Sequence, residues 1–241
     1  MKILGQVVIL LALSGAIGSA QTYSIIYNFT NYSGGLEPKT GLTFNNNVLY
    51  GTTSYGGSGG TLFKINPDGS GYLALSSPGG YAFNAGLTMN GSTLYAASGS
   101  AIFKVNVDIG NYVDLLSYTG SPLSAFVLNG TNLLATSNQG GSAGWGSIFR
   151  INTDGTMSAR LYSFSNSPDG ARPLAGLVLD GNTLYGTTSS GGNANGGVVF
   201  KINLDGTGYT ILHHFASYPD GSSPQGDLVL DGNTLYGTTQ Y

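Results

Sequence analysis

The chain of 241 residues contains no cysteine and few charged side chains. The lack of cysteine excludes disulfide bonds, a thiol nucleophile, thiolate metal sites and a lipid-modified cysteine. Charged residues make up only 8% of the chain and the formal net charge is −3. With no basic patch in the sequence, nucleic acid is not an expected partner.

Long apolar runs are also lacking, except within the first twenty residues. There Lys2 precedes the apolar stretch ILGQVVILLALSGAIG, and the small residues Gly18, Ser19 and Ala20 follow. This order is typical of a secretory signal peptide, and the stretch is too short for a membrane-spanning helix, which needs roughly 20 apolar residues. We predict a signal peptide over residues 1–20, a secreted mature chain over residues 21–241, and no membrane span in it.

Glycine and tyrosine are abundant, and they occur within a repeat. The twelve residues LVLDGNTLYGTT occur twice, from Leu177 and from Leu228. Looser copies begin at Leu42, Leu87 and Phe126, which gives five repeats, numbered below in chain order. Self-similarity with a spacing of about 40–50 residues indicates a solenoid or a propeller.

Two further motifs follow in each of the first four repeats. One is TLFKIN at residue 61, with copies AIFKVN, SIFRIN and VVFKIN at residues 101, 147 and 198. The other is YTILHHFA at residue 209, with copies at residues 112 and 158 and a degenerate form at residue 71. Together with the twelve-residue motif they predict four short strands per repeat, which is typical of a propeller blade.

The first two strands are expected to form a hairpin. The dipeptide Asp180-Gly181 in repeat 4 and the Asp-Gly or Asn-Gly pairs at residues 231, 90 and 129 favour two-residue turns of type I′, with positive φ at both central residues. Repeat 1 has Asn-Asn at residue 45 instead.

These patterns predict an all-β fold, a β-propeller of four-stranded antiparallel blades. The segment YSIIYNFT at Tyr23 matches the fourth strand of a repeat, and the last repeat has only its first two strands. We therefore predict four complete blades and one incomplete composite blade, in which the N-terminal strand joins the C-terminal hairpin. Residues 21–241 are predicted to form a single repeat domain, and we expect the natural chain to continue beyond Tyr241, because an open sheet edge is unfavourable.

The pattern GLVLDGNTLYGTT, followed by a glycine-rich loop and VFKINxDG, resembles the GloVer-type tandem repeat of exported bacterial choice-of-anchor proteins. The resemblance covers the mature chain and is strongest in repeats 4 and 5, whereas repeats 2 and 3 carry Ala96-Ala97-Ser98 and Ala135-Thr136-Ser137 in place of Gly-Thr-Thr. It implies a bacterial extracytoplasmic protein, often with a C-terminal anchoring signal that this chain lacks. It supplies no catalytic residues.

Most polar candidates have structural explanations. Seven aspartates directly precede glycine and are expected in turns, although the loops SPDGARP and YPDGSSP could in principle bind calcium. His213 and His214 should point to opposite faces of a strand, so they are not expected to share a metal. Four cations at one strand position are expected to pack their aliphatic stems and expose their charges: Lys64, Lys104, Arg150 and Lys201. No catalytic residue and no metal ligand is assigned.

Two residues are candidates for binding. Trp145 is the only tryptophan and lies in the glycine-rich loop GGSAGWGS, where an exposed aromatic ring could stack on a sugar. Asp227 stands where the other repeats have Gly41, Gly86, Ala125 and Gly176, at the start of the strand expected to line a propeller axis.

The sequence therefore favours a monomeric, secreted or surface-displayed scaffold that binds extracellular polysaccharide or another surface protein. Two alternatives stay open. A carbohydrate-active enzyme would need two carboxylates about 5–10 Å apart in one cleft, and a structural spacer of the cell surface would need no site at all.

Overall fold

A computed structural model describes residues 25–30, 34–38, 40–57, 59–76, 82–83, 85–99, 101–117, 124–156, 158–216 and 218–241. The predicted signal peptide lies outside these residues. Contacts divide the chain into two compact units, residues 1–83 and residues 84–241, which are described separately below. The single repeat domain expected from the sequence remains a prediction.

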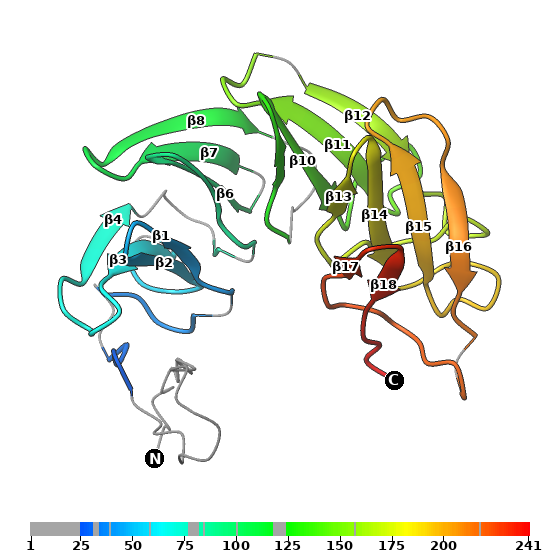
Figure 1. The fold of residues 1–241 in the computed structure, drawn as a ribbon, viewed down its shortest axis with the longest axis horizontal. Coiled ribbons are helices and arrows are strands. Elements are labelled where there is room, and N and C mark those ends of the chain that lie inside the picture. The colour runs from blue at the N-terminus through cyan, green and yellow to red at the C-terminus, as the bar shows by residue number, and fades with distance from the viewer. Residues whose placement is uncertain are drawn as a thin grey trace. The chain divides into compact units, whose positions relative to one another are not determined.

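The N-terminal unit contains one four-stranded antiparallel sheet, sheet 1 (Figure 1). Its strands follow one another in chain order: β1 (Thr43–Asn45), β2 (Val48–Thr53), β3 (Thr61–Ile65) and β4 (Leu73–Ser76).

The C-terminal unit contains three more sheets of the same topology and a final hairpin. Sheet 2 consists of β5 (Thr88–Asn90), β6 (Thr93–Ser98), β7 (Ala101–Asn106) and β8 (Asn111–Ser117). Sheet 3 consists of β9 (Val127–Asn129), β10 (Asn132–Ser137), β11 (Ser147–Asn152) and β12 (Ser158–Ser163). Sheet 4 consists of β13 (Val178–Asp180), β14 (Thr183–Thr188), β15 (Val198–Asn203) and β16 (Thr210–His214), and the hairpin pairs β17 (Val229–Asp231) with β18 (Thr234–Tyr236).

The four complete repeats therefore correspond one to one with four four-stranded sheets, as predicted. No helix occurs among the residues that the structure describes. The all-β prediction and the four complete blades are confirmed, and the fifth repeat contributes the two-stranded sheet β17–β18. Its completion by the N-terminal segment into a composite blade remains a prediction.

The hairpin turns differ from the prediction in both register and type. In sheet 4 Asp180 pairs with Thr183, so the central residues of the turn are Gly181 and Asn182 rather than Asp180 and Gly181. Only the first of these has positive φ, at +54°, which is the pattern of a type II′ turn. Asp180 instead ends the strand. Repeat 1 does form the predicted type I′ pattern, because Asn46 and Asn47 both have positive φ.

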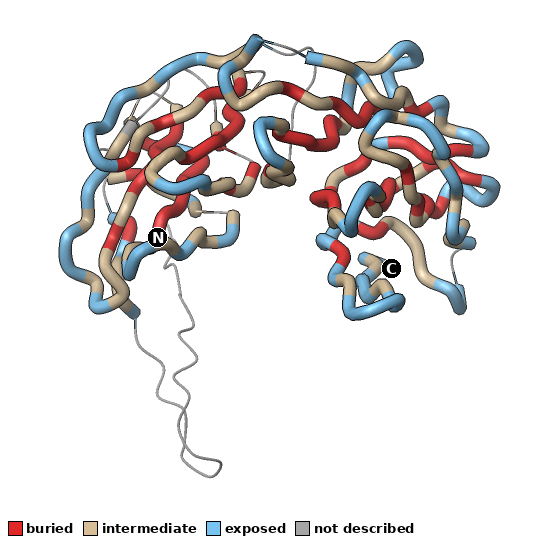
Figure 2. The backbone as a smooth tube through the Cα atoms, turned by 45° about the horizontal axis from the view of Figure 1, so that its top comes forward, coloured by how far each residue is buried: buried red, intermediate tan, exposed pale blue. Residues whose placement is uncertain are grey.

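The second and third strands of each sheet form its core, whereas the fourth strand is largely exposed (Figure 2). A register shift occurs at the same place in all four sheets, just before the phenylalanine of the third strand. These phenylalanines are nearly inaccessible to solvent and lie at the centre of each blade: Phe63, Phe103, Phe149 and Phe200. Apolar burial of this kind is the main favourable contribution to folding.

Residues 25–30 pack in the N-terminal unit as a fourth strand packs elsewhere. In the C-terminal unit Gly155 lies against the carbonyl oxygen of Leu115, and Gly206 against that of Leu161. Gly69 lies against the carbonyl oxygen of Ile26 in the same way. These three residues are all at the fourth position of the YTILHHFA-type motif, so the sequence match of the N-terminal segment has a structural counterpart. The segment is nevertheless not part of a sheet among the described residues.

Candidate functional site: a pocket around Trp145

Trp145 lies in the loop of residues 138–146, which joins β10 to β11 in sheet 3. The loop closes on itself through a hydrogen bond from the Gly146 N–H to the Gly140 carbonyl oxygen, with a distance of 3.0 Å. Sheet 4 has a loop of equal length, residues 189–197, closed by the equivalent bond from Gly197 to Gly191 at 3.1 Å. The two loops therefore share a fold and differ in the side chains that they present.

The largest of these differences is at Trp145 itself, because sheet 4 has Gly196 at this position. A Cβ atom on Gly196 would collide with the carbonyl oxygen of Phe215, so the loop of sheet 4 cannot carry a side chain there in its present conformation. In sheet 3 the position carries an indole that is 36% exposed. Both loops use the main chain of this residue identically: the Trp145 carbonyl accepts from the N–H of Arg172, and the Gly196 carbonyl accepts from that of Ser223, each at 2.8 Å.

Arg172 is held beside Trp145 by its backbone. Its carbonyl oxygen accepts hydrogen bonds from the N–H of Ser189 at 3.1 Å and from the hydroxyl of Ser189 at 2.8 Å. Its φ is +54°, a region that non-glycine residues rarely adopt. The guanidinium carbon lies 5.9 Å from the centroid of the indole ring, within the range of a cation–π interaction.

These two residues line a pocket of about 700 Å³ in the C-terminal unit, between the loops of repeats 3, 4 and 5. Arg172 carries the only formal charge among the ten lining residues, and most of the others offer amide or hydroxyl groups. The ten are Asn138, Gln139, Gly144, Trp145, Arg172, Leu174, Ser189, Ser190, Ser223 and Gln225.

Asn138 lines this pocket and also has a buried polar atom without a partner. Its side-chain oxygen Oδ1 is buried and has no hydrogen-bond partner. A buried acceptor without a donor costs about 1–3 kcal/mol, and few such atoms persist in folded proteins.

Asp227, the second candidate from the sequence, is not among the residues that line the pocket. Its carboxylate oxygen Oδ1 accepts a hydrogen bond from the N–H of Gly176. Residues 176 and 227 hold the same position in repeats 4 and 5, so this bond links the starts of two successive repeats. The observed contact of Asp227 is thus a structural one, and its part in binding remains a prediction.

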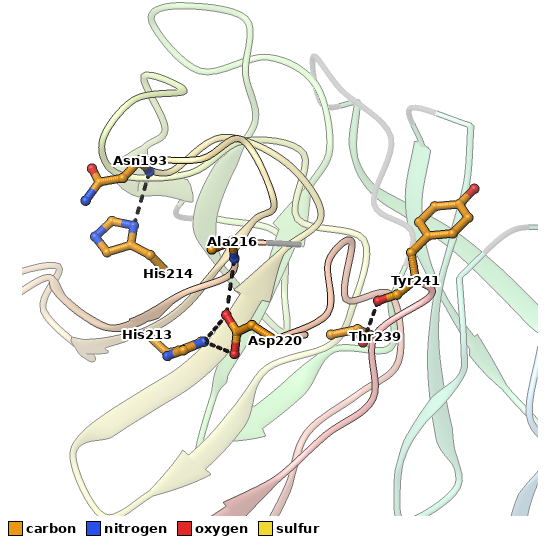
Figure 3. Close-up of polar contacts among 7 residues, drawn as sticks. All are labelled: Asn193, His213, His214, Ala216, Asp220, Thr239 and Tyr241. Carbon is orange, nitrogen blue, oxygen red and sulfur yellow. Dashed lines mark hydrogen bonds and ion pairs between the residues drawn. The ribbon is translucent and has the colours of Figure 1, made fainter. Parts of the chain in front are cut away.

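The two adjacent histidines contact different partners, as expected for successive residues of a strand (Figure 3). His213 Nε2 lies 2.9 Å from Asp220 Oδ2, and the ring nitrogen Nδ1 of His214 accepts from the N–H of Asn193 at 3.3 Å. Asp220 also accepts from the N–H of Ala216 at 3.1 Å.

A related contact occurs at the equivalent positions of another repeat. In the preceding repeat the hydroxyl of Tyr162 donates to Asp169 at 2.8 Å, and the N–H of Ser165 donates to the same carboxylate. The pair Tyr162–Asp169 thus occupies the place of His213–Asp220. In both repeats the aspartate lies in the loop after the fourth strand and joins this loop to the strand by hydrogen bonds.

Three other aspartates form the expected turns. Asp68, Asp154 and Asp205 each accept from the N–H and the hydroxyl of the residue two positions later, at 2.6–2.9 Å. The side-chain hydrogen bond and then the backbone hydrogen bond lower the pKa of each carboxyl group. In the described part of the chain there is no group of three or more His, Cys, Asp or Glu side chains that could hold a metal ion. Calcium binding by the loops SPDGARP and YPDGSSP, through one carboxylate and carbonyl oxygens, remains a prediction.

The four cations at one strand position are each partly buried, as expected. Each cation pairs in register with a residue of the second strand. Lys64, Lys104 and Lys201 pair with tyrosines, and Arg150 pairs with Leu134. The ammonium group of Lys104 donates to the carbonyl oxygen of Thr153 at 3.2 Å.

The repeated four-stranded sheets place this chain in the class of β-propeller-type repeat proteins. Residues 101–241, more than half of the chain, match the sequence profile of the Gloeobacter/Verrucomicrobia repeat. The chain belongs to this family, which confirms the resemblance found in the sequence. A comparison with curated proteins gives no match.

Solved propeller-like structures share the fold at low sequence identity. A chain of a nidogen/laminin complex matches with a TM-score of 0.53 and 17% identity over 76% of this chain. A proposed TolB from Agrobacterium tumefaciens matches with a TM-score of 0.52 and 12% identity over 69% of this chain. The matches span 65% and 61% of the lengths of those two chains.

Sequence reasoning singled out Trp145 as a candidate but not Arg172 or Asn138, which line the same pocket. Arg172 lies in the loop SPDGARP, which drew attention only as a possible calcium loop. A signal was present, since Arg172 aligns with Glu37 in repeat 1 and Ser223 in repeat 5, each followed by proline. A position is a candidate for ligand recognition when its side chain differs between repeats while the neighbouring residues recur.

Proposed function

We propose that this protein is a non-catalytic binding scaffold, and that the pocket around Trp145 binds an extracellular glycan. The observation that supports the proposal is the combination of one exposed indole with a ring of amide and hydroxyl groups in a volume of about 700 Å³. Ligand pockets typically measure about 300–1,000 Å³ and combine apolar or aromatic surface with a few placed polar groups. A sugar ring offers both an apolar face for the indole and hydroxyl groups for the amides.

The pocket is better suited to binding than to hydrolysis of a glycan. Glycosidases as a rule place two carboxyl groups on either side of the scissile bond, and none of the ten lining residues is acidic. The sequence features that predict secretion, namely the predicted signal peptide and the resemblance to exported repeat proteins, would bring this pocket into contact with extracellular polysaccharide.

Trp145→Gly provides the sharpest test, because it converts the loop to the residue that sheet 4 carries at this position. We expect the wild-type protein to bind one or more polysaccharides on a glycan array and the variant to lose at least tenfold in affinity. Loss of a stacked aromatic commonly costs about 1–3 kcal/mol, and 1.4 kcal/mol corresponds to a factor of ten.

The matched control is Tyr218→Ala, which removes an aromatic side chain that is 97% exposed and lies outside the pocket. This variant should bind as the wild type does. If no glycan binds to the wild-type protein, or if Trp145→Gly binds as tightly as the wild type, the proposed function is wrong.

A further inference from the structure

We propose that the pocket selects an acidic polysaccharide, one whose sugars carry a carboxylate or a sulfate group beside free hydroxyls. This inference rests on the proposed function and specifies the ligand of the same site. Three chemical requirements lead to it, and they come from Arg172, from the amide and hydroxyl groups of the lining, and from Trp145.

The first requirement is negative charge. Arg172 carries the only charged group in the lining of the pocket, and no carboxylate among the described residues pairs with it. A guanidinium group presents a planar array of donors that matches carboxylate and similar oxyanions, often through two parallel hydrogen bonds. An anionic ligand would supply the partner that the protein itself does not.

The backbone around Arg172 indicates that its side chain is free to serve recognition. Glu37, Arg172 and Ser223 hold the same position in three repeats, with φ values of +55°, +54° and +58°. Their carbonyl groups accept equivalent backbone hydrogen bonds, from Ser54, Ser189 and Gln240. The fold therefore requires the backbone conformation at this position, whereas the side chain can be acidic, basic or neutral.

The second requirement is hydrogen-bonding capacity besides the charge. Most of the other lining residues offer amide or hydroxyl groups, among them Gln139, Ser189 and Gln225. Sugar hydroxyl groups can both donate to such groups and accept from them, whereas a simple inorganic anion such as sulfate can only accept.

The third requirement is an apolar face of sufficient area for the indole of Trp145. Sugar rings meet all three requirements when they bear an acidic substituent. The whole chain has a net charge of −3, so it would repel a polyanion at long range. Recognition then depends on the local charge of Arg172, and binding should weaken as salt screens that charge.

The test measures binding of three oligosaccharides to the full chain by isothermal titration calorimetry. The probes are an oligogalacturonate, the neutral oligosaccharide obtained by reducing its carboxyl groups, and a sulfated galactan oligosaccharide. We expect at least one of the two acidic probes to bind at least tenfold more tightly than the neutral one, and the better of the two identifies carboxylate or sulfate as the recognised group.

Two substitutions separate the role of Arg172 from general electrostatics. Arg172→Gln should lose at least tenfold in affinity for the acidic probe, and its loss of affinity for the neutral probe should be clearly smaller. Arg160→Gln removes the same charge from an exposed position on β12 outside the pocket and should bind both probes as the wild type does.

The outcomes distinguish this inference from the proposed function. If all three probes bind equally and only Trp145→Gly weakens them, the selection of acidic sugars is wrong and the glycan site stands. If Arg160→Gln weakens binding as much as Arg172→Gln, recognition by the pocket is likewise refuted. If no acidic or neutral glycan binds at all, both the inference and the proposed function fail.

Discussion

Sheet 4 packs against sheet 3 through aromatic rings, whereas the described residues at the contact between sheets 3 and 2 are mainly aliphatic. In the first contact Tyr162 stacks on Tyr209, with ring centroids 4.0 Å apart and an interplanar angle of 9°. Phe164 and Phe200 complete a cluster of four rings. In the second contact Leu116 and Ser158 stand at the positions of Tyr162 and Tyr209, and the buried neighbours of Phe149 include Ile102, Leu133 and Ile151.

The aromatic arrangement recurs in the N-terminal unit with nearly the same geometry. Tyr27 stacks on Tyr72 at 4.1 Å and 7°, while Phe29 and Phe63 stand 5.0 Å apart. In both cases two rings come from a fourth-strand segment and the other two from the repeat that follows it, so the cluster lies between successive repeats.

The largest expected effect comes from Phe200, the ring at the centre of the aromatic contact. Phe200→Ala should lower the free energy of unfolding by about 3–5 kcal/mol, because it leaves a cavity among buried side chains. Phe200→Leu should cost less than Phe200→Ala but still lose the ring contacts with Phe164 and Tyr209, since aromatic pairs contribute about 0.5–1.5 kcal/mol beyond the area that they bury. Urea unfolding followed by the fluorescence of Trp145, the single tryptophan, measures both variants. A cost near zero for Phe200→Leu would show that the ring contacts of Phe200 contribute nothing beyond apolar burial.

The hairpins should behave alike in the two sheets, unlike the contacts. Gly181 in sheet 4 and Gly130 in sheet 3 have φ of +54° and +59°, and a Cβ atom on either would meet no other atom within 4 Å. Gly181→Val and Gly130→Val should therefore each cost more than about 1 kcal/mol from backbone strain alone. The same urea experiment measures them. A cost near zero at Gly181 would contradict the turn assignment, and a large difference between the two sites would show that the hairpins are not equivalent.

Strand number, strand order and the four complete blades could be predicted because they depend on local patterns repeated several times. The hairpin register was missed by one residue. Asp-Gly suits two turn types, and only the pairing of Asp180 with Thr183 shows that Gly181 comes first in the turn. A choice between turns of similar local energy is decided by the pairing of whole strands, which single dipeptides do not encode.

The candidate site was only partly predictable for a related reason. Trp145 stood out as a rare residue in a loop, but Arg172 follows 27 positions later in another repeat and meets it through a backbone hydrogen bond. The shared role of Tyr162 and His213 was missed because the two side chains look unlike in sequence. Both nevertheless reach the aspartate seven residues further on. Contacts between repeats depend on how the sheets pack against each other, and this packing cannot be predicted from the motifs of single repeats.

The smallest expected effect comes from removing the hydroxyl group of Tyr209 while its ring is kept. The hydroxyl donates to the carbonyl oxygen of Asp169 at 2.6 Å, and sheet 3 has Ser158 at this position. Tyr209→Phe keeps the ring stack, so it should cost only about 0.5–1.5 kcal/mol, the net value of one hydrogen bond. Urea unfolding at pH 7 measures this loss, and a cost as large as that of Phe200→Ala would mean that the hydroxyl rather than the ring holds the contact.

The same variant should change the dependence of stability on alkaline pH. Burial, followed by the neighbouring Tyr162 and Asp169, raises the pKa of Tyr209 above the value of 10.0 of a free tyrosine. A group whose pKa is raised on folding contributes its full stabilisation below the unfolded pKa and loses it as the pH rises toward the folded pKa. The free energy of unfolding should therefore fall between pH 9 and pH 11, and it should fall less steeply in Tyr209→Phe, because Tyr162 still contributes. Tyr218→Phe, at an exposed position, should follow the wild-type curve, and identical slopes for all three proteins would refute the burial of the Tyr209 hydroxyl at the aromatic contact.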